Sequence, residues 1–132
     1  MDLSDVFKAL GDPIRLRILS LVGTKELCVC MLAEVLNVSQ PSVSKHLNRL
    51  RYSNIIKCRK ISQWCFYSLS DSFRTHCSEL LDFLFKEWEQ SEQYQCDVKK
   101  LDYLKNTYCC CQQLLIEAEK NEEPPRNGDS SY

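Results

Sequence analysis

The stretch "LCVCMLAEVLNVSQPSVSKHLNRLR" constrains the fold more than any other part of the chain, because it holds two helical patterns separated by a very short break. The first pattern covers about residues 27–36 and stops at Asn37, a residue type that readily adopts the left-handed conformation at a helix end. Ser39 is a good N-cap for the second helix, and Pro41 falls in its first turn, where a missing N–H costs little. Two helices joined by so short a turn predict a helix-turn-helix.

The second of these helices has one apolar and one polar face. Val43, Leu47 and Leu50 recur at i, i+4 and i+7 and should face the core. The outward residues are short hydrogen-bonding or cationic side chains. Such side chains suit base edges and phosphates in a major groove, whereas an ordinary solvated helix face does not require them. We predict DNA contacts from this face and from the segment that follows it, at Gln40, Ser42, Ser44, Lys45, His46, Arg49, Arg59 and Lys60.

The charge distribution supports the same interpretation. Residues 37–70 contain six bases and no acid, whereas residues 77–132 contain twelve acids and six bases. A basic middle beside an acidic end indicates a module that binds a polyanion. The basic part closes with "IIKCRKISQWCFYSLS" at 55–70, which alternates apolar with polar residues, is rich in β-branched and aromatic types, and has a weak break near residues 61–63. This pattern predicts a β-hairpin, the wing of a winged helix.

The remaining segments are mostly helical by spacing. The length of 132 residues suits one domain, so we expect a mainly α fold with a small β-hairpin, a winged helix-turn-helix. No long apolar run or signal peptide is visible, so we expect a cytoplasmic protein without a membrane partner. Further helices are predicted over about 3–10, 13–22, 71–90 and 96–118. The expected division is a DNA-binding and dimerisation domain at 1–90, a helical extension with clustered cysteines at 91–118 and a disordered tail at 119–132.

Nine cysteines are the other unusual feature. An odd number in a chain without an export signal favours thiol, redox or soft-metal chemistry over a disulfide framework. Cys28 and Cys30 stand at the start of the predicted helix 27–36, where the exposed N–H groups should lower a thiol pKa. On a regular helix the two would point about 200° apart, so they could share an ion only if the helix start unwound. The cysteines expected to act as small buried hydrophobes are Cys58, Cys65 and Cys77.

Together, "DPIRLRIL", "ELCVCMLAEVLNVSQPSVSKHLNRLR" and "YSNIIKCRKISQWCFYSLS" resemble the arsenic-repressor (ArsR/SmtB) family of winged-helix metal sensors, over about residues 3–90. The resemblance implies a homodimer joined through its first and last helices, bound to an inverted repeat in double-stranded operator DNA. It also implies release by arsenite or antimonite at Cys28 and Cys30, with no organic cofactor. In the arsenic-responsive branch a third cysteine usually follows, and here that position is Ala33.

A third sulfur would therefore have to come from elsewhere in the dimer. Cys109, Cys110 and Cys111 could complete the site, form a second metal site with Cys96, or bind nothing. The same cysteines could make a cadmium or lead site by replacing the N-terminal arm cysteines of that branch, since no cysteine precedes Cys28. A zinc-type site is disfavoured because the chain has only His46 and His76.

Two further classes were compared with the metal sensor. A redox repressor would join Cys28 or Cys30 to a C-terminal cysteine as a disulfide, which would distort the start of the helix over 27–36 and release DNA. An enzyme with a cysteine nucleophile would need a Cys-x-x-Cys redox loop or an oxyanion cradle, and neither is visible, so we expect no enzymatic activity. A DNA-binding protein with inert thiols is the remaining alternative.

Overall fold

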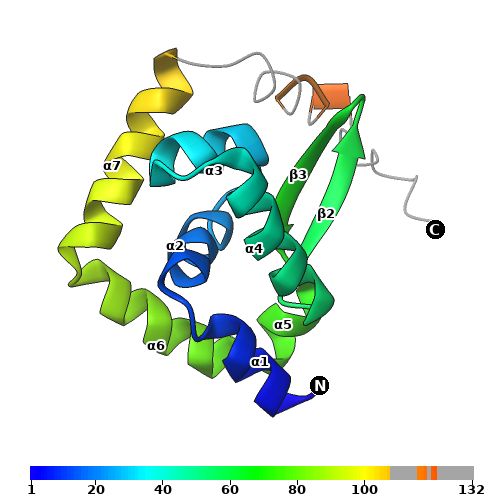
Figure 1. The fold of residues 1–132 in the computed structure, drawn as a ribbon, viewed down its shortest axis with the longest axis vertical. Helices are drawn as coiled ribbons and strands as arrows, with labels where there is room; N and C mark the ends of the chain where they lie inside the picture. The colour runs from blue at the N-terminus through cyan, green and yellow to red at the C-terminus, as the bar shows by residue number, and fades with distance from the viewer. Residues whose placement is uncertain (108–115, 119, 122–132) are drawn as a thin grey trace, which may run out of the picture.

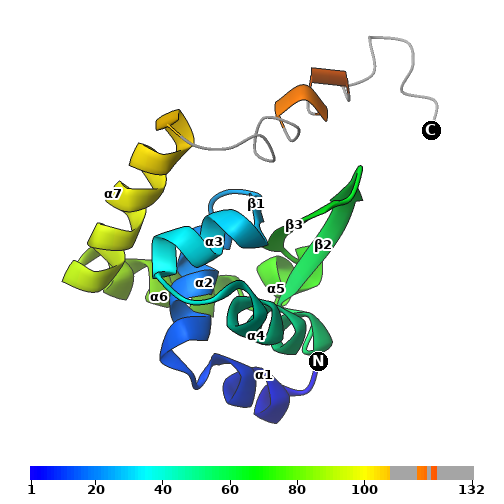
Figure 2. The ribbon, with the colours of Figure 1, turned by 45° about the horizontal axis from the view of Figure 1, so that its top comes forward.

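The computed structural model describes residues 1–107, 116–118 and 120–121, and shows a helical body from which a β-hairpin projects (Figure 1). Figure 2 shows strands β2 and β3 reaching away from the helices as a narrow arm. The mainly helical fold with a small hairpin is confirmed. Within this part of the chain the elements are α1 (Leu3–Leu10), α2 (Pro13–Val22), β1 (Leu27–Cys28), α3 (Val29–Leu36), α4 (Gln40–Tyr52), β2 (Ile56–Ile61), β3 (Trp64–Leu69), α5 (Asp71–His76), α6 (Ser78–Glu89) and α7 (Glu92–Thr107).

Helices α3 and α4 form the predicted helix-turn-helix. Asn37 ends α3 in the left-handed conformation, with φ 55° and ψ 47°. The Ser39 hydroxyl accepts the backbone N–H of Ser42 at 3.4 Å and caps α4, and Pro41 occupies the first turn. These caps satisfy helix-end groups that would otherwise lack partners, so the short turn is specified by local sequence.

The core lies where α4 packs against α2 and α3. Val43, Leu47 and Leu50 are each 0% exposed, as the helical spacing predicts. Phe66 of β3 and Phe73 of α5 are also fully buried, so the core continues under the hairpin. The buried stripe of α4 fixes which of its faces remains outside.

The hairpin is confirmed as an antiparallel pair in which Ile56 lies opposite Leu69 and Ile61 opposite Trp64. Its turn relies on Ser62, which takes φ 58° without being Gly or Asn. A third strand was not predicted: β1 pairs with β3, giving the order β1-β3-β2. Two residues are too few to show a strand pattern, and the β3 edge supplies their partners.

Two predicted helix boundaries are wrong. The helix expected over 27–36 begins only at Val29, because Leu27 and Cys28 are extended and paired with β3. The helix expected over 71–90 is broken at Cys77, whose φ of −117° and ψ of 30° end α5 before α6 starts. Neither helix boundary is marked by Gly or Pro, so tertiary contacts determine both boundaries.

Helix α7 begins at Glu92, earlier than the predicted start near residue 96, and its described part ends at Thr107. It turns back and packs against α2 and α3 instead of standing apart from the body (Figure 1). Residues 116–118 are helical. Most of the predicted disordered tail, 119–132, lies outside the described residues. In the part of the chain that the structure describes, no helix has the length and apolar character needed to cross a membrane.

Candidate functional site

The outward face of α4 carries the first group of predicted site residues. Gln40 and Lys45 are exposed, and Ser42 and Ser44 are half-buried along its borders. Asn48 is exposed one turn beyond Lys45 and was missed by the sequence analysis. Its position at i+3 from Lys45, with an amide that both donates and accepts, is the signal that could have identified it.

Arg49 lies at the edge of this face and is held by the protein itself. Its Nη2 donates to Oδ1 of Asp5 on α1 at 3.0 Å, and its Nη1 donates to the Ser53 hydroxyl. The hydrogen bond from Ser53 is the largest cause that lowers the pKa of Asp5; burial opposes it, and the hydrogen bond and charge of Arg49 add to the lowering. Arg49 therefore ties α4 to α1 in this state.

His46 is directed toward the start of α2. Its Nδ1 lies 3.2 Å from Nη1 of Arg15 and 3.9 Å from Oδ1 of Asp12. Because a guanidinium can only donate, the contact with Arg15 makes Nδ1 the acceptor. Burial raises the pKa of Asp12, but the backbone N–H groups of Arg15 and Ile14 outweigh it and the net shift is downward. His46 thus lies at the α2–α4 junction.

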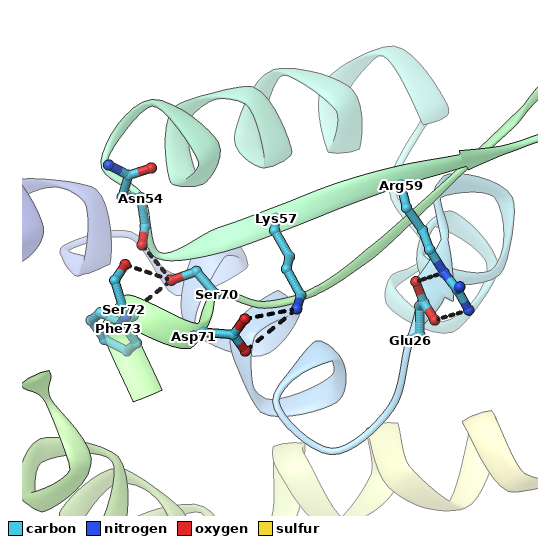
Figure 3. Close-up of polar contacts among 8 residues, drawn as sticks. All are labelled: Glu26, Asn54, Lys57, Arg59, Ser70, Asp71, Ser72 and Phe73. Carbon is cyan, nitrogen blue, oxygen red and sulfur yellow. Dashed lines mark hydrogen bonds and ion pairs between the residues drawn. The ribbon is translucent and has the colours of Figure 1, made fainter. Parts of the chain in front are cut away.

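Two ion pairs organise the basic side of the hairpin (Figure 3). Arg59 donates from Nε and Nη2 to the two carboxylate oxygens of Glu26, at 2.6 and 2.8 Å. Lys57 lies 3.4 Å from the carboxylate of Asp71. Lys60, nearer the hairpin tip, is exposed. The predicted contact residue Arg59 therefore orients the hairpin against the loop before β1, while Lys60 faces solvent.

The second candidate site is the thiol pair. Cys28 Sγ and Cys30 Sγ lie 2.9 Å apart, beyond the S–S bond length of about 2.0 Å, and no disulfide joins them. Cys28 is extended and acts as the N-cap residue of α3, with φ −87° and ψ 162°, and is 0% exposed. Cys30 is half-buried in the first turn. The expectation that the two would point about 200° apart is wrong, because only one of them is helical.

The thiol pair connects the sheet to the helix-turn-helix. Cys28 pairs with Phe66 in the β1–β3 ladder, and Cys30 belongs to α3, which packs directly on α4. The two thiols therefore stand on neighbouring elements, one in the sheet and one on the helix that packs against α4.

The other cysteines are divided differently from the prediction. Cys77 is buried, as expected, but Cys58 and Cys65 are half-buried and lie together on the hairpin. Cys96 is exposed on α7. Among the described residues no three Cys, His, Asp or Glu side chains gather as a metal site, so Cys96 does not join the thiol pair there. The predicted ligands Cys109, Cys110 and Cys111 lie outside the described residues.

The end of α7 lies close to the thiol pair. Lys25, three residues before Cys28, is 3.5 Å from the carboxylate of Asp102. The same lysine lies beside Lys105, and the contact between the two side chains, followed by burial and the charge of Lys25, lowers the pKa of Lys105. The described part of α7 therefore ends beside the loop that leads into β1.

Comparison with known proteins gives a consistent result. Residues 12–57 match the family model described as bacterial regulatory protein, arsR family. An HTH-type transcriptional regulator of Methanocaldococcus jannaschii is 40% identical over 82 residues, which is 61% of this chain and 92% of that protein. The arsenical resistance operon repressor of Escherichia coli is 37% identical over 98 residues, 73% of this chain and 81% of the repressor. A cadmium resistance transcriptional regulatory protein, CadC homolog, of Staphylococcus aureus is 41% identical over 88 residues, which is 64% of this chain and 69% of that protein.

Solved structures agree on the fold. Reduced HlyU from Vibrio cholerae superimposes with a TM-score of 0.54 at 35% identity, covering 62% of this chain and 86% of HlyU. The homodimeric winged helix-turn-helix DNA-binding domain of a Mycobacterium bovis protein gives a TM-score of 0.57 at 22% identity, covering 64% and 79%. At that identity the second match supports the fold alone.

Proposed function

The chain belongs to the ArsR family of bacterial regulatory proteins, a family of DNA-binding transcriptional regulators and not of enzymes, and from this premise we propose that it is a homodimeric repressor released from its operator by trivalent arsenic or antimony. The observation that carries the proposal is the pair of thiols 2.9 Å apart at the start of α3. The pair is placed on the helix that supports the DNA-reading helix.

DNA contact is assigned to α4 and the hairpin. Gln40, Ser42 and Ser44 offer hydrogen-bonding groups at the start of α4, with Asn48 further along its exposed face, and Lys45 offers a cation for phosphate. Lys60 on the hairpin would reach the phosphates of an adjacent groove. Arg49, His46 and Arg59 have a positioning role in this proposal, because each is engaged with another element of the same chain.

The homodimer interface is assigned to α1 and α6. Leu3 and Phe7 on α1 are 61% and 57% exposed, and Phe83 on α6 is 58% exposed. Leu3 and Phe7 line a depression of about 470 Å³ together with Leu80 of α6. Large apolar side chains gathered at one surface usually mark a protein interface. A symmetric pair of such surfaces would place two α4 helices on the two halves of an inverted repeat.

Release follows from the spacing of the two sulfurs. An ion held by both Cys28 and Cys30 would set a new spacing between their sulfur atoms. Because Cys28 is held in the sheet, Cys30 and the first turn of α3 would move, and with them the packing of α3 on α4.

A third sulfur is assigned to the C-terminal cysteines. Asp102 lies against Lys25, three residues before Cys28. From Asp102 the chain continues in α7 to Thr107, about 7.5 Å at 1.5 Å per residue. Cys109, Cys110 and Cys111 follow soon after in the sequence, so they are the cysteines nearest to the end of α7 that contacts the loop before β1.

A cadmium-responsive repressor is the second candidate. It is favoured by the similarity to the cadmium resistance regulatory protein of Staphylococcus aureus, and by a soft ion's ability to take four thiolates. In that case two C-terminal cysteines would complete the site.

The test is fluorescence anisotropy of the reduced full chain on an inverted-repeat operator from its own promoter, titrated separately with arsenite, cadmium and a disulfide-forming oxidant. Release by arsenite at near-stoichiometric amounts supports the arsenic sensor. Release by cadmium alone replaces it with the second candidate. Release by oxidant alone indicates a redox repressor, and no release by any of them defeats all three.

A further inference from the structure

The register of the hairpin brings two more cysteines together. Cys58 of β2 lies opposite Tyr67, and Cys65 of β3 lies opposite Lys60. Residues two apart in a strand share a face, so Cys58 and Cys65 are diagonal neighbours on one face of the hairpin. Both residues are half-buried, and Cys65 is near enough to act electrostatically on Cys58. The sequence separation of seven residues hides this pair.

This pair is distinct from Cys28 and Cys30. Cys28 lies opposite Phe66, the neighbour of Tyr67, and successive residues of a strand point to opposite faces. Cys58 and Cys65 therefore lie on the other face of the sheet from Cys28. Arg51, near the C-terminal end of α4, is close enough to act electrostatically on Cys58, and β2 packs against α4.

The geometry disfavours a direct disulfide between Cys58 and Cys65. Diagonal neighbours in an antiparallel sheet have Cα atoms roughly 7–8 Å apart, whereas disulfides span about 4.4–6.8 Å. Burial raises the pKa of the Cys58 thiol, and the neighbouring Cys65 raises it further. A protonated thiol reacts slowly with oxidants, since the thiolate is the nucleophile. An atom that bonds to both sulfurs can bridge this longer separation. A ligand whose leaving groups accept the thiol protons can react without prior formation of a thiolate.

We propose that Cys58 and Cys65 form a dithiol site on the wing that binds monosubstituted trivalent arsenicals, compounds with one organic group and two hydroxyls on arsenic. Each thiol replaces one hydroxyl: two S–H and two As–OH bonds break, two As–S bonds form, and the protons leave with the hydroxyls as two water molecules. Arsenic stays trivalent, so no oxidant or reductant is required.

The test counts adducts of phenylarsine oxide, which hydrates to the required dihydroxy form, on the reduced full chain by native mass spectrometry. Cys58→Ser, Cys65→Ser and the double variant should each lose the same single adduct. Cys77→Ser, a buried cysteine of the same body, should lose none. Loss of two adducts in the double variant would show two independent thiols, and no loss in the single variants would show no site; either result overturns the proposal. Cys28→Ser/Cys30→Ser should leave this adduct in place, so the outcome does not depend on the proposed inducer site.

Discussion

Arg17 on α2 holds the buried carboxylate of Asp97 on α7 through two hydrogen bonds, Nε to Oδ2 and Nη2 to Oδ1, both 2.9 Å long. Asp97 is 3% exposed and also accepts from Gln93. The carboxylate raises the pKa of Arg17, against an opposing effect of burial. This pair fixes α7 against the body, and it joins residues eighty positions apart in the chain.

Asp97→Asn should destabilise the protein by about 3 kcal/mol, because it leaves the Arg17 guanidinium largely buried without its counter-charge. The measurement is the free energy of unfolding from urea denaturation. Asp102→Asn is the matched control on the same helix, since the Asp102 side chain is 60% exposed and its pair with Lys25 should contribute less than about 1 kcal/mol. Equal losses in the two variants would show that the Arg17–Asp97 pair does not anchor α7.

Cys30→Ser should retain operator affinity, because serine is close in size, but lose the response to arsenite, because the proposed three-sulfur site loses one of its ligands. Cys28→Ser should behave alike, with some loss of stability because Cys28 is fully buried. Operator release followed by anisotropy provides the measurement, with Cys96→Ser on the exposed face of α7 as control. Normal release of both Cys28→Ser and Cys30→Ser would remove the thiol pair from the sensing site.

Lys45→Ala should weaken binding to specific and nonspecific DNA alike and reduce the slope of log affinity against log salt by about one unit, since each phosphate contact contributes about that much. Lys99→Ala removes an equally exposed charge from α7 and should leave the slope unchanged. An unaltered slope in Lys45→Ala would take this lysine out of the interface.

Phe7→Glu should shift the protein from dimer to monomer in sedimentation velocity and weaken operator binding, because a charge would replace an apolar contact on α1. Tyr103→Glu is the control: Tyr103 is 67% exposed but stands on α7, away from the proposed interface. A dimeric Phe7→Glu variant would place the interface elsewhere.

Asp12→Ala should cost about 1 kcal/mol at neutral pH through loss of the α2 N-cap. The folded pKa of Asp12 is lowered, so its electrostatic contribution is complete above the unfolded value of 3.8 and is lost as the pH falls below it. The stability difference between wild type and Asp12→Ala should therefore narrow below that pH. A difference of constant size down to the acid limit would contradict this linkage.

The sequence by itself determined the helix-turn-helix and the hairpin, because their signals are local. The helix ends are marked within a few residues by Asn37, Ser39 and Pro41. The buried face of α4 is predicted by the helical spacing of Val43, Leu47 and Leu50. The outward position of Lys45 follows from the same spacing. All the predicted DNA-binding residues therefore stand on the expected elements. The side chains of His46, Arg49 and Arg59 are held by partners from distant segments, which the local pattern does not show.

Only the tertiary structure decided how the thiols are arranged. Leu27 and Cys28 become a strand because β3 offers an unpaired edge, and this pairing brings Cys28 and Cys30 within 2.9 Å, where helical geometry would separate them. Cys58 and Cys65 meet through strand register, and Asp97 finds Arg17 through the return of α7. Each of these contacts depends on hydrogen-bond ladders and packing between segments far apart in the chain, and local sequence patterns carry no information about such partners.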